Sequence, residues 1–498
     1  MKIFSASQIK NWDAYSIREQ HITADAMMER AAASCYHWLI NNHFTQKPIL
    51  VFCGKGNNGS DGLALARMLA QSNIPVTVYI LEPGKPGSDD FQVNLQRLQQ
   101  LTGNIHFIQS EHFFPLIEKD HLVIDALFGT GLNKPLDNIA LQLVEYLNHS
   151  HVPIISIDLP SGLFPDKSTA GSATIHALHT LSFQSIKLAF LMPENNLSVG
   201  EFHILDIGLS RQYEEEESAV HEIMDPGIIR ALIKPRNKFS HKGSFGHAAL
   251  VTGSYGMMGA AVLAAKGCMQ TGTGKLTCYI PSCGYDIMQL SVPEAMCKVA
   301  GEKVIESIGN ITGYDAIGIG PGIGLQNEFS LLLKEIFQAA NKPLVLDADA
   351  LNTLAADKKL LVQIPEGSVI TPHPKEFERM FGMVENDFER LQLAADKASQ
   401  LKIYIVLKGH YTAVITPHGK IYFNNTGNAG MAKAGMGDIL TGMITGLLSQ
   451  QYPLPEAAML AVYLHGLAGD IAASKYSQQA MQASHLLNCI GDAWKLIT

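Results

Sequence analysis

Short apolar runs alternate with longer helical segments along most of this chain. Each run is followed by a polar or glycine-containing turn, and stretches such as 63–71 then show helical periodicity. Strand–helix alternation of this kind predicts parallel β-sheets that are covered by helices on both faces. The predicted strands are 49–53, 76–81, 122–126 and 154–158 in the first half, and 248–252, 316–320, 344–347, 369–371, 403–407 and 413–416 in the second half.

A polar seam at residues 209–240 divides this pattern into two halves. It contains the acidic run 214–217, then Asp-Pro-Gly at 225–227 and a basic, proline-containing stretch at 235–243. Four like charges bounded by Pro and Gly favour a linker, although the end of an acidic helix is the alternative. We therefore predict two α/β domains, residues 1–212 and 213–498.

A strongly patterned helix begins near residue 438. Its apolar residues form one buried stripe, and its small residues form the opposite face: Ile439, Leu440, Met443, Ile444, Leu447 and Leu448 against Thr441, Gly442, Thr445 and Gly446. This pattern predicts a helix that is packed tightly on both sides. The free N–H groups of Gly435, Met436 and Gly437 at its start would form an anion hole.

Asp438 lies in the first turn of the same predicted helix. A carboxylate beside an anion hole can accept the proton of a hydroxyl group that takes up a phosphoryl group. An aspartate that only stabilises the helix dipole is the alternative. The combination favours phosphoryl transfer.

A glycine-rich loop, Gly54-Lys55-Gly56-Asn57-Asn58-Gly59-Ser60-Asp61-Gly62, follows the first predicted strand. It contains G-x-G-x-x-G, and Glu82 follows the next strand, which matches a dinucleotide fingerprint in outline. However, the amide and carboxylate oxygens of Asn57, Asn58 and Asp61 suit a hydroxylated ligand or a hard cation better than bare pyrophosphate. A purely structural turn is the remaining interpretation.

Two aspartates end predicted strands near this loop. Asp125 ends LVIDA and Asp158 ends IISID, so both are expected at the rim of the sheet. Gly129-Thr130-Gly131-Leu132 is a second loop whose N–H groups could wrap a phosphate. Lys187 is a cation within an apolar stretch and is interpreted either as a site residue or as a snorkelling surface lysine.

Further loops of the second half are expected to meet near Asp438. The segment 320–324 is glycine-rich and follows a strand, His373 is fixed between two prolines, and 408–412 could meet a nucleotide. Asp347 and Asp349 follow another strand, where they are suited to bind Mg²⁺ or to cap a helix.

Composition narrows the class of protein. The formal net charge of −9 argues against a general nucleic-acid-binding surface. Seven cysteines without a C-x-x-C pair indicate free thiols in a reducing compartment. We see no signal peptide and no long uncharged apolar run, so a cytoplasmic protein without membrane association is expected, and it is expected to be a homo-oligomer.

The order of these motifs resembles one family over nearly the whole chain. GKGNNGSDG, GTG and IDLPSG come first, and KGSFG, GPGIG, LDADALN, TPHPKEFERM, LKGHYT and NAGMAKAGMGDILTG follow the seam. This series is similar to the bifunctional NAD(P)H-hydrate repair enzymes, which fuse a Rossmann-like epimerase to a ribokinase-like dehydratase. The resemblance is most specific in the second half.

The resemblance implies the substrate and the reactions. The substrate is NADHX or NADPHX, a reduced nicotinamide cofactor in which water has added across a ring double bond. The epimerase interconverts the R and S hydrates, and the dehydratase phosphorylates the S hydroxyl group and eliminates phosphate. The donor is ADP in the bacterial type and ATP in the eukaryotic type. K⁺ is implied in the first domain and Mg²⁺ in the second.

The resemblance also implies residue roles. The hydrate would bind in the first domain to Asn57, Asn58, Gly59, Ser60, Asp61, Gly129, Thr130, Gly131, Leu132, Asn133, Lys134, Pro135 and Asp158. It would bind in the second to Ala261, Gly324, His373 and Asp438. The nucleotide would bind to Lys408, Gly409, His410, Tyr411, Thr412 and Gly437. Asn58, Asp125 and Ser161 would hold K⁺, and Asp438, Asp158 and Lys187 would be catalytic.

One position departs from the family pattern. The family loop reads N-N-G-G-D-G, whereas this chain has Ser60 at the second glycine. A serine held at positive φ would cost roughly 1 kcal/mol, whereas at negative φ its hydroxyl group would add a contact.

Other functions remain open at the level of the sequence. A ribokinase-type kinase with a non-catalytic N-terminal binding domain would explain the second half equally well. An NAD-dependent oxidoreductase would use the loop after the first strand, but the polar residues of that loop argue against it. A non-catalytic role of the first domain alone is the third possibility.

Overall fold

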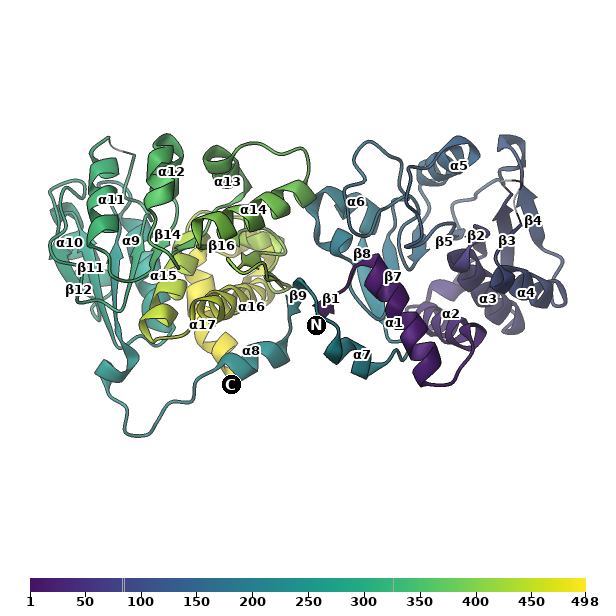
Figure 1. Cartoon of the computed structure of the whole chain (residues 1–498), viewed down its shortest axis with the longest axis horizontal. Helices are drawn as coiled ribbons and strands as arrows, with labels where there is room; N and C mark the ends of the chain where they lie inside the picture. The colour runs from purple at the N-terminus through teal and green to yellow at the C-terminus, as the bar shows by residue number, and fades with distance from the viewer. Residues whose placement is uncertain (83, 85, 326) are drawn as a thin grey trace. The chain divides into compact units, whose positions relative to one another are not determined.

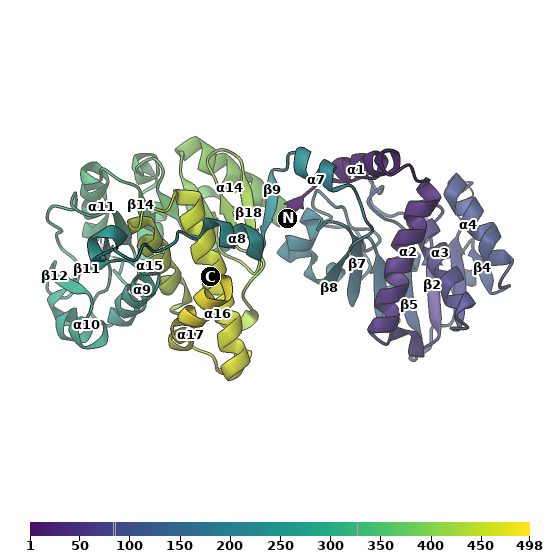
Figure 2. The same cartoon turned by 90° about the horizontal axis from the view of Figure 1, so that it is seen from below.

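The computed structural model describes residues 1–82, 84, 86–325 and 327–498. The chain forms two compact α/β units (Figures 1 and 2). One comprises residues 2–219 with 386–388, and the other comprises Met1 with 220–385 and 389–498. The acidic run 214–217 mostly belongs to helix α7 (Arg211–Glu216), which Ser210 caps by accepting a hydrogen bond from the Tyr213 N–H group. The linker interpretation of this run is therefore wrong, and the helix-end alternative is the one observed.

The first unit contains a parallel sheet with helices between its strands. The strands of this sheet are β2 (Ile49–Cys53), β3 (Val76–Leu81), β4 (Ile105–Ile108), β5 (Leu122–Ala126), β6 (Ile154–Ile157), β7 (His179–Phe183) and β8 (Glu201–Leu205), and the short strand β1 (Lys2–Ile3) is not part of it. The helices are α1 (Ala6–Glu19), α2 (Ala24–Asn41), α3 (Asn57–Gln71), α4 (Asp89–Gln99), α5 (Asn138–His149), α6 (Asn196–Val199) and α7.

The order of the strands in the first sheet is β4-β3-β2-β5-β6-β7-β8, and all neighbouring pairs are parallel. Its central strands β2 and β5 are buried along their whole length, as strands covered on both faces should be. The four strands predicted in this half are present. Strands β4, β7 and β8, which complete the two edges, were not predicted from the sequence.

The second unit is built in the same way around a larger sheet. Its strands are β9 (His221–Met224), β10 (His247–Val251), β11 (Lys275–Ile280), β12 (Met296–Val299), β13 (Ala316–Ile319), β14 (Leu344–Leu346), β15 (Val369–Ile370), β16 (Tyr404–Leu407), β17 (Ala413–Ile415) and β18 (Ile421–Asn424). Its helices are α8 (Pro226–Leu232), α9 (Met258–Gln270), α10 (Tyr285–Ser291), α11 (Asn327–Ala339), α12 (Asp349–Ala356), α13 (Pro374–Phe381), α14 (Asp387–Leu401), α15 (Met436–Ser449), α16 (Leu454–Ala480) and α17 (Ala483–Ile497).

The strand order in this unit is β9-β18-β17-β16-β15-β14-β13-β10-β11-β12. The strands from β16 to β12 in this order are parallel, whereas β17 is antiparallel to both β16 and β18. The expectation of parallel pairing thus holds for most of the sheet and fails at this hairpin. The carboxyl ends of β13, β14, β15 and β16 lie next to one another, which brings together the loops that follow them.

Helices α9 and α15 pack against each other with very little space between their backbones. A methyl group on Gly442 would lie 1.9 Å from the carbonyl oxygen of Ala264, and one on Gly446 would lie 2.6 Å from that of Cys268. The small-residue face of α15 therefore allows the close approach, and its apolar stripe packs into the core on the other side. This confirms the predicted tight packing on both faces.

One described helix segment, Leu454–Tyr476 within α16, is long and apolar enough to cross a membrane by length and composition alone, although no membrane span was expected from the sequence. However, 72% of its most apolar window is buried inside the structure, as expected for a core helix of this unit.

Candidate functional site

The carboxyl ends of β2, β5 and β6 lie side by side in the first unit. From β2 the chain continues outward to β3 and β4, whereas from β5 it continues to β6, β7 and β8. Ligands of open parallel sheets bind at such a switch point. Asn57 begins α3 after β2, Asp125 lies at the end of β5, and Asp158 follows β6. The structure thus brings these three predicted positions to one edge of the sheet.

Asn58 is a buried polar side chain that lacks a partner. It is 8% exposed, and both its amide oxygen and its amide nitrogen are buried without a hydrogen bond. A methyl group on Gly129 would lie 3.2 Å from Cβ of Asn58 and 3.4 Å from Oδ2 of Asp158. These three residues therefore border one small space. Leaving a buried amide unpaired costs about 1–3 kcal/mol, so a polar ligand in that space would be favoured.

Asp125 is fully buried and anchors the loop that follows β5. Its carboxylate accepts hydrogen bonds from Ser156 Oγ at 2.8 Å, from the Ser161 N–H group at 2.9 Å and from Ser161 Oγ at 2.5 Å. Burial nevertheless raises the pKa of Asp125, and these hydrogen bonds only partly oppose it. Ser161 Oγ also accepts a hydrogen bond from the Phe128 N–H group, which ties Asp125 to the loop containing Gly129.

Asp158 and Lys187 form a buried ion pair. The Lys187 ammonium group lies 2.5 Å from Oδ1 of Asp158 and 2.5 Å from Ser182 Oγ, and the lysine side chain is 1% exposed. Lys187 is therefore not a snorkelling surface lysine. Asp158 has a φ of 63°, a left-handed conformation that is strained for a non-glycine residue. Lys187 holds Oδ1, so Oδ2 is the oxygen that faces Gly129.

Two further carboxyl groups lie in the electrostatic range of Asp158. Burial, together with Asp158 and Asp13, raises the pKa of Asp61 well above its usual range. Burial and Asp158 raise the pKa of Asp13 to about 6, although Lys187 opposes this. Asp13 lies on α1 and was not identified from the sequence. Its surroundings there, an ordinary amphipathic helix, gave no signal.

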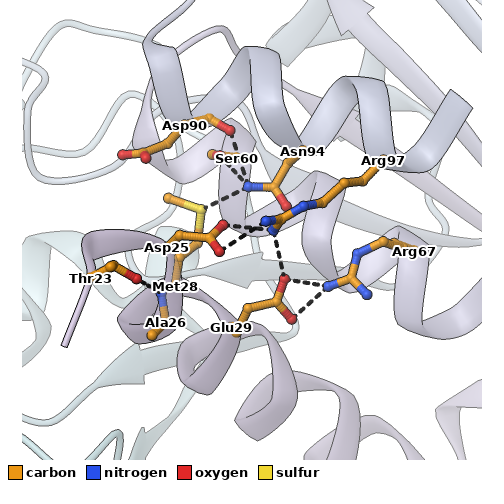
Figure 3. A network of polar contacts seen from close by, with 10 residues as sticks. All are labelled: Thr23, Asp25, Ala26, Met28, Glu29, Ser60, Arg67, Asp90, Asn94 and Arg97. Carbon is orange, nitrogen blue, oxygen red and sulfur yellow. Dashed lines mark hydrogen bonds and ion pairs between the residues drawn. The ribbon is translucent and has the colours of Figure 1, made fainter.

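Ser60 is part of helix α3 and is not among the residues with positive φ, so the serine causes no backbone strain. Its hydroxyl oxygen accepts a hydrogen bond from Asn94 Nδ2 at 3.2 Å (Figure 3). The same network contains Arg97, which binds Asp25 at 2.7 Å, and Arg67, which pairs with Glu29. The departure from the family pattern therefore adds a contact between α3 and α4 within a network that also joins α2.

The remaining predicted positions of the first unit differ in exposure. Ser60 is fully buried, whereas Gly131, Asn133, Lys134 and Pro135 are exposed in the loop that leads to α5. Glu82 pairs with Lys55 at 2.5 Å. Its carboxylate therefore has a cation partner, whereas in a dinucleotide site the corresponding acid binds a ribose.

The second site lies at the carboxyl ends of β14 and β16. Asp347 follows β14, is 2% exposed, and accepts hydrogen bonds from Lys408 Nζ at 2.9 Å and from Thr441 Oγ1 at 2.6 Å. Burial alone would raise the pKa of Asp347, but Lys408 and Thr441 outweigh burial and lower it. Burial likewise disfavours the charge of Lys408, yet Asp347 and Glu376 raise its pKa. Both groups are therefore charged at neutral pH.

Asp438 lies in the first turn of α15, next to this ion pair. Burial and the negative charge of Asp347 raise the pKa of Asp438 to about 6, whereas Lys408 opposes this shift. The N-cap residue Gly435 has a φ of 91°, which places the first turn of the helix after a left-handed residue. A methyl group on Gly437 would lie 3.5 Å from Lys408 Nζ and 3.5 Å from Asp347 Oδ2. The start of α15 thus combines free N–H groups, a cation and a carboxyl group.

His373 is the N-cap of α13. Its Nδ1 accepts a hydrogen bond from the Glu376 backbone N–H group at 3.2 Å, and the backbone N–H group of His373 donates to Glu376 Oε2 at 2.8 Å. Glu376 also lies 3.8 Å from Lys408 Nζ. Because of this contact, the electrostatics of His373 and Lys408 are linked, and burial lowers the pKa of His373. This role of Glu376 was not predicted from the sequence.

The other predicted positions of the second unit are spread around these groups. The Gly324 N–H group donates to Asp349 Oδ2 at 2.9 Å. Residues 409–412 form the turn between β16 and β17, where Thr412 Oγ1 donates to the Gly409 carbonyl oxygen at 2.9 Å. Ala261 lies on α9 and is fully buried in the core.

A cavity of about 890 Å³ lies elsewhere in the second unit, at the ends of several helices. Its cations bind the carbonyl oxygens of these ends: Arg236 binds Gly272, Lys234 binds Gln451, and Arg230 binds Leu496. Such ends carry partial negative charge, which the cations neutralise. Gln450 caps the far end of α15, roughly 20 Å from Asp438 by helix length, so this cavity is separate from the site.

Comparison with known proteins finds matches over both units. Residues 248–491 match the family described as NAD(P)H-hydrate dehydratase, and residues 24–189 match the family described as YjeF-related protein N-terminus. A bifunctional NAD(P)H-hydrate repair enzyme of Moorella thermoacetica is 33% identical over 98% of this chain and 96% of its own length. That of Escherichia coli is 30% identical over 98% of this chain and 93% of its own length.

Solved structures match the second unit. An ADP/ATP-dependent NAD(P)H-hydrate dehydratase from Bacillus subtilis, co-crystallised with ATP and Mg²⁺, is 34% identical with a TM-score of 0.51. The match covers 56% of this chain and 99% of that chain. A ribokinase-like superfamily protein from Enterococcus faecalis is 26% identical with a TM-score of 0.50, and this match covers 57% of this chain and 98% of that one.

Proposed function

Because this chain belongs to the family of bifunctional NAD(P)H-hydrate repair enzymes, we propose that its first unit epimerises NAD(P)HX and that its second unit dehydrates the S form. The single observation that carries this proposal is the match to complete bifunctional relatives over nearly the whole chain. The predicted fold class, with a ribokinase-like second domain, is confirmed by the same comparisons. A kinase with an idle first domain would leave the polar site of that domain without a role.

In the first unit, Asp158 is proposed to exchange a proton with the hydrate. Lys187 fixes Oδ1 of Asp158, so Oδ2 is left to bind the substrate in the space beside Gly129. Asn58 borders the same space and has an unpaired amide that can bind a hydroxyl group or an amide of the substrate. The exposed residues between Gly129 and Pro135 would cover the bound hydrate from the solvent side.

The first unit also has residues that fit K⁺. Hard cations are bound by carboxylate, hydroxyl and amide oxygens, and Asp125, Ser161 and Asn58 offer one of each. Asp125 and Ser161 are in contact, and the amide oxygen of Asn58 has no partner, which supports the fit. When bound, K⁺ would offset the charge of Asp125. These three residues would hold it and thereby position the loop containing Gly129.

In the second unit, Asp438 is proposed to act as the base. It would take the proton of the S hydroxyl group while that oxygen forms a bond to the terminal phosphorus of the nucleotide and the bond to the leaving nucleotide breaks. The N–H groups from Gly435 to Gly437 and the Lys408 ammonium group would stabilise the transferred phosphoryl group. Phosphate then leaves with the C–O bonding pair, and transfer of a ring proton to the departing phosphate or to water restores the double bond of NAD(P)H.

Nucleotide and metal follow from the same site. The similarity to a dehydratase crystallised with ATP and Mg²⁺ supports a nucleotide donor and Mg²⁺, and we propose ADP or ATP as the donor. Residues 408–412 would bind the nucleotide beside Gly437. Asp349 and Asp347 lie in the electrostatic range of Asp438, and their carboxylate oxygens fit Mg²⁺, which would neutralise phosphate charge. His373 and the loop ending at Gly324 would bind the hydrate. A cytoplasmic homo-oligomer remains part of the proposal.

One experiment tests both activities. Mixed R and S epimers of NADHX are incubated with the protein and ADP, or with ATP, and recovery of the reduced nicotinamide is followed by its absorbance. Recovery of all the hydrate requires epimerisation as well as dehydration. Recovery that stops at the S fraction would refute the epimerase assignment, and no recovery with either nucleotide would refute the dehydratase assignment.

A further inference from the structure

Three potential metal ligands lie together on the neighbouring strands β7 and β8. His179 is paired in register with Glu201, and Leu181 is paired with His203. Glu201 and His203 are two residues apart, so their side chains share one face of the sheet. One ligand atom from each of His179, Glu201 and His203 lies within 4.8 Å of the other two. The sheet thus brings together two imidazoles and a carboxylate.

The distances in this cluster are close to those around a tetrahedral metal ion. His179 Nδ1 lies 3.1 Å from His203 Nε2 and 3.8 Å from Glu201 Oε2. Zinc–ligand bonds of about 2.0–2.1 Å place two ligand atoms about 3.3 Å apart in tetrahedral geometry. The two nitrogens are therefore nearly at the required separation. The Glu201 side chain is 71% exposed, so its carboxylate is free to move toward the two nitrogens.

The surroundings favour neutral and ordered imidazoles. Burial lowers the pKa of His179 and of His203, so both rings are neutral at physiological pH and can offer lone pairs. The Trp38 ring centroid lies 5.2 Å from that of His179 and 4.7 Å from that of His203. Phe44 packs against His179 at 5.4 Å. These aromatic rings restrict the imidazoles to the observed arrangement.

This cluster is separate from the epimerase site. His179 and Glu201 are the first residues of β7 and β8, whereas Asp158 and Asn58 lie beyond the carboxyl ends of β6 and β2. In a parallel sheet, the amino ends and the carboxyl ends of the strands lie on opposite sides of the sheet. A strand of five residues spans about 16 Å, so the proposed epimerisation does not use the cluster.

We propose that His179, Glu201 and His203 bind one divalent transition-metal ion of the zinc class, with water as the fourth ligand. Two imidazoles and one carboxylate are a ligand set that zinc uses with an open fourth position. In the metal-free protein, one ring N–H group bridges the two imidazoles, so that ring must carry its proton on its other nitrogen when the ion binds. The bound ion would link β8, which forms an edge of the sheet, to β7.

Zinc binding is measured by competition with a chromophoric chelator, using the full chain without an affinity tag, after removal of metal and under reducing conditions. Co²⁺ is then added separately, because its visible absorption distinguishes tetrahedral sites. The expected result is one site with tetrahedral Co²⁺ absorption, which His203→Ala weakens at least about tenfold. Glu201→Gln, which alters only an exposed side chain, should weaken binding while retaining the fold.

The matched control is His121→Ala. His121 belongs to a second group with Glu118 and Asp120, but its Nδ1 already accepts a hydrogen bond from the Glu118 N–H group. This variant should bind zinc like the unmodified chain. Thermal unfolding in chelator should show that each variant is folded, and zinc should raise the unfolding temperature of the unmodified chain more than that of His203→Ala. Equal zinc affinity of the unmodified chain and His203→Ala, or no tetrahedral Co²⁺ absorption, would overturn the proposal.

Discussion

Replacement of Asp438 by Asn tests the base proposed for dehydration. The side chain keeps its size, but it can no longer accept a proton from the S hydroxyl group. General bases contribute about 10²–10⁴-fold to the rate, so kcat for dehydration should fall by that factor. The KM for the hydrate should change much less, because the neighbouring N–H groups and Lys408 remain.

The pKa of Asp438 adds a second and more specific expectation. A rise from 3.8 to about 6 favours the neutral acid by about 3 kcal/mol, at about 1.4 kcal/mol per pH unit. Asp438 works as a base only when it is ionised. The dehydration rate of the unmodified protein should therefore fall as the pH decreases through about 6.

Lys408→Met should move this acidic limb of the profile to higher pH. Lys408 lowers the pKa of Asp438, so its removal leaves burial and Asp347 to raise that pKa further. The assay is the rate of NADH recovery from purified S-NADHX with ADP between pH 5 and 9, all three proteins being compared. Epimerisation by the Asp438→Asn variant serves as the control for folding. Normal dehydration by Asp438→Asn, or an acidic limb that does not move in Lys408→Met, would refute the reasoning.

Three further predictions concern the first unit. Lys187→Met leaves the largely buried Asp158 without its partner, so the free energy of unfolding in urea should fall by about 3 kcal/mol. The double variant with Asp158→Asn should regain most of this loss. A double variant no more stable than the single variant would contradict this prediction. Gly129→Ala places a methyl group 3.2 Å from Cβ of Asn58 and 3.4 Å from Oδ2 of Asp158. The exchange rate of R- and S-NADHX, followed by chromatography, should therefore fall at least tenfold, with dehydration unchanged. Normal exchange would show that this space is not the site. The pKa of Asp13 is raised to about 6, so the native state binds its proton more tightly than the unfolded chain does. The free energy of unfolding of Asp13→Asn should therefore equal that of the unmodified protein below pH 4 and exceed it by up to about 3 kcal/mol above pH 6. An equal difference in this free energy at both pH values would exclude this cause.

The sequence predicted the central strands of both sheets because burial on both faces demands continuous apolar runs, as in ILVFC of β2. It did not predict β7 and β8, whose sequences HTLSF and EFHIL mix polar with apolar residues. Strands at and near an edge do not need a continuous apolar run, because some of their side chains are exposed. The location of both sites followed from the rule that ligands bind at the carboxyl ends of parallel strands, which needs only the strands.

The electrostatics of the two sites could not be obtained in the same way, because they depend on partners that are distant in the chain. The buried ammonium group of Lys187 contacts the carboxylate of Asp158, which is held at a φ of 63°. Likewise, Asp347 contacts Lys408 directly, which lowers the pKa of Asp347, whereas burial and the negative charge of Asp347 raise the pKa of Asp438. One aspartate thus stays ionised and fixes the lysine, which leaves the other free to gain and lose a proton near neutral pH. This division of roles between two carboxyl groups is the physical basis on which Asp438, and not Asp347, is assigned as the base.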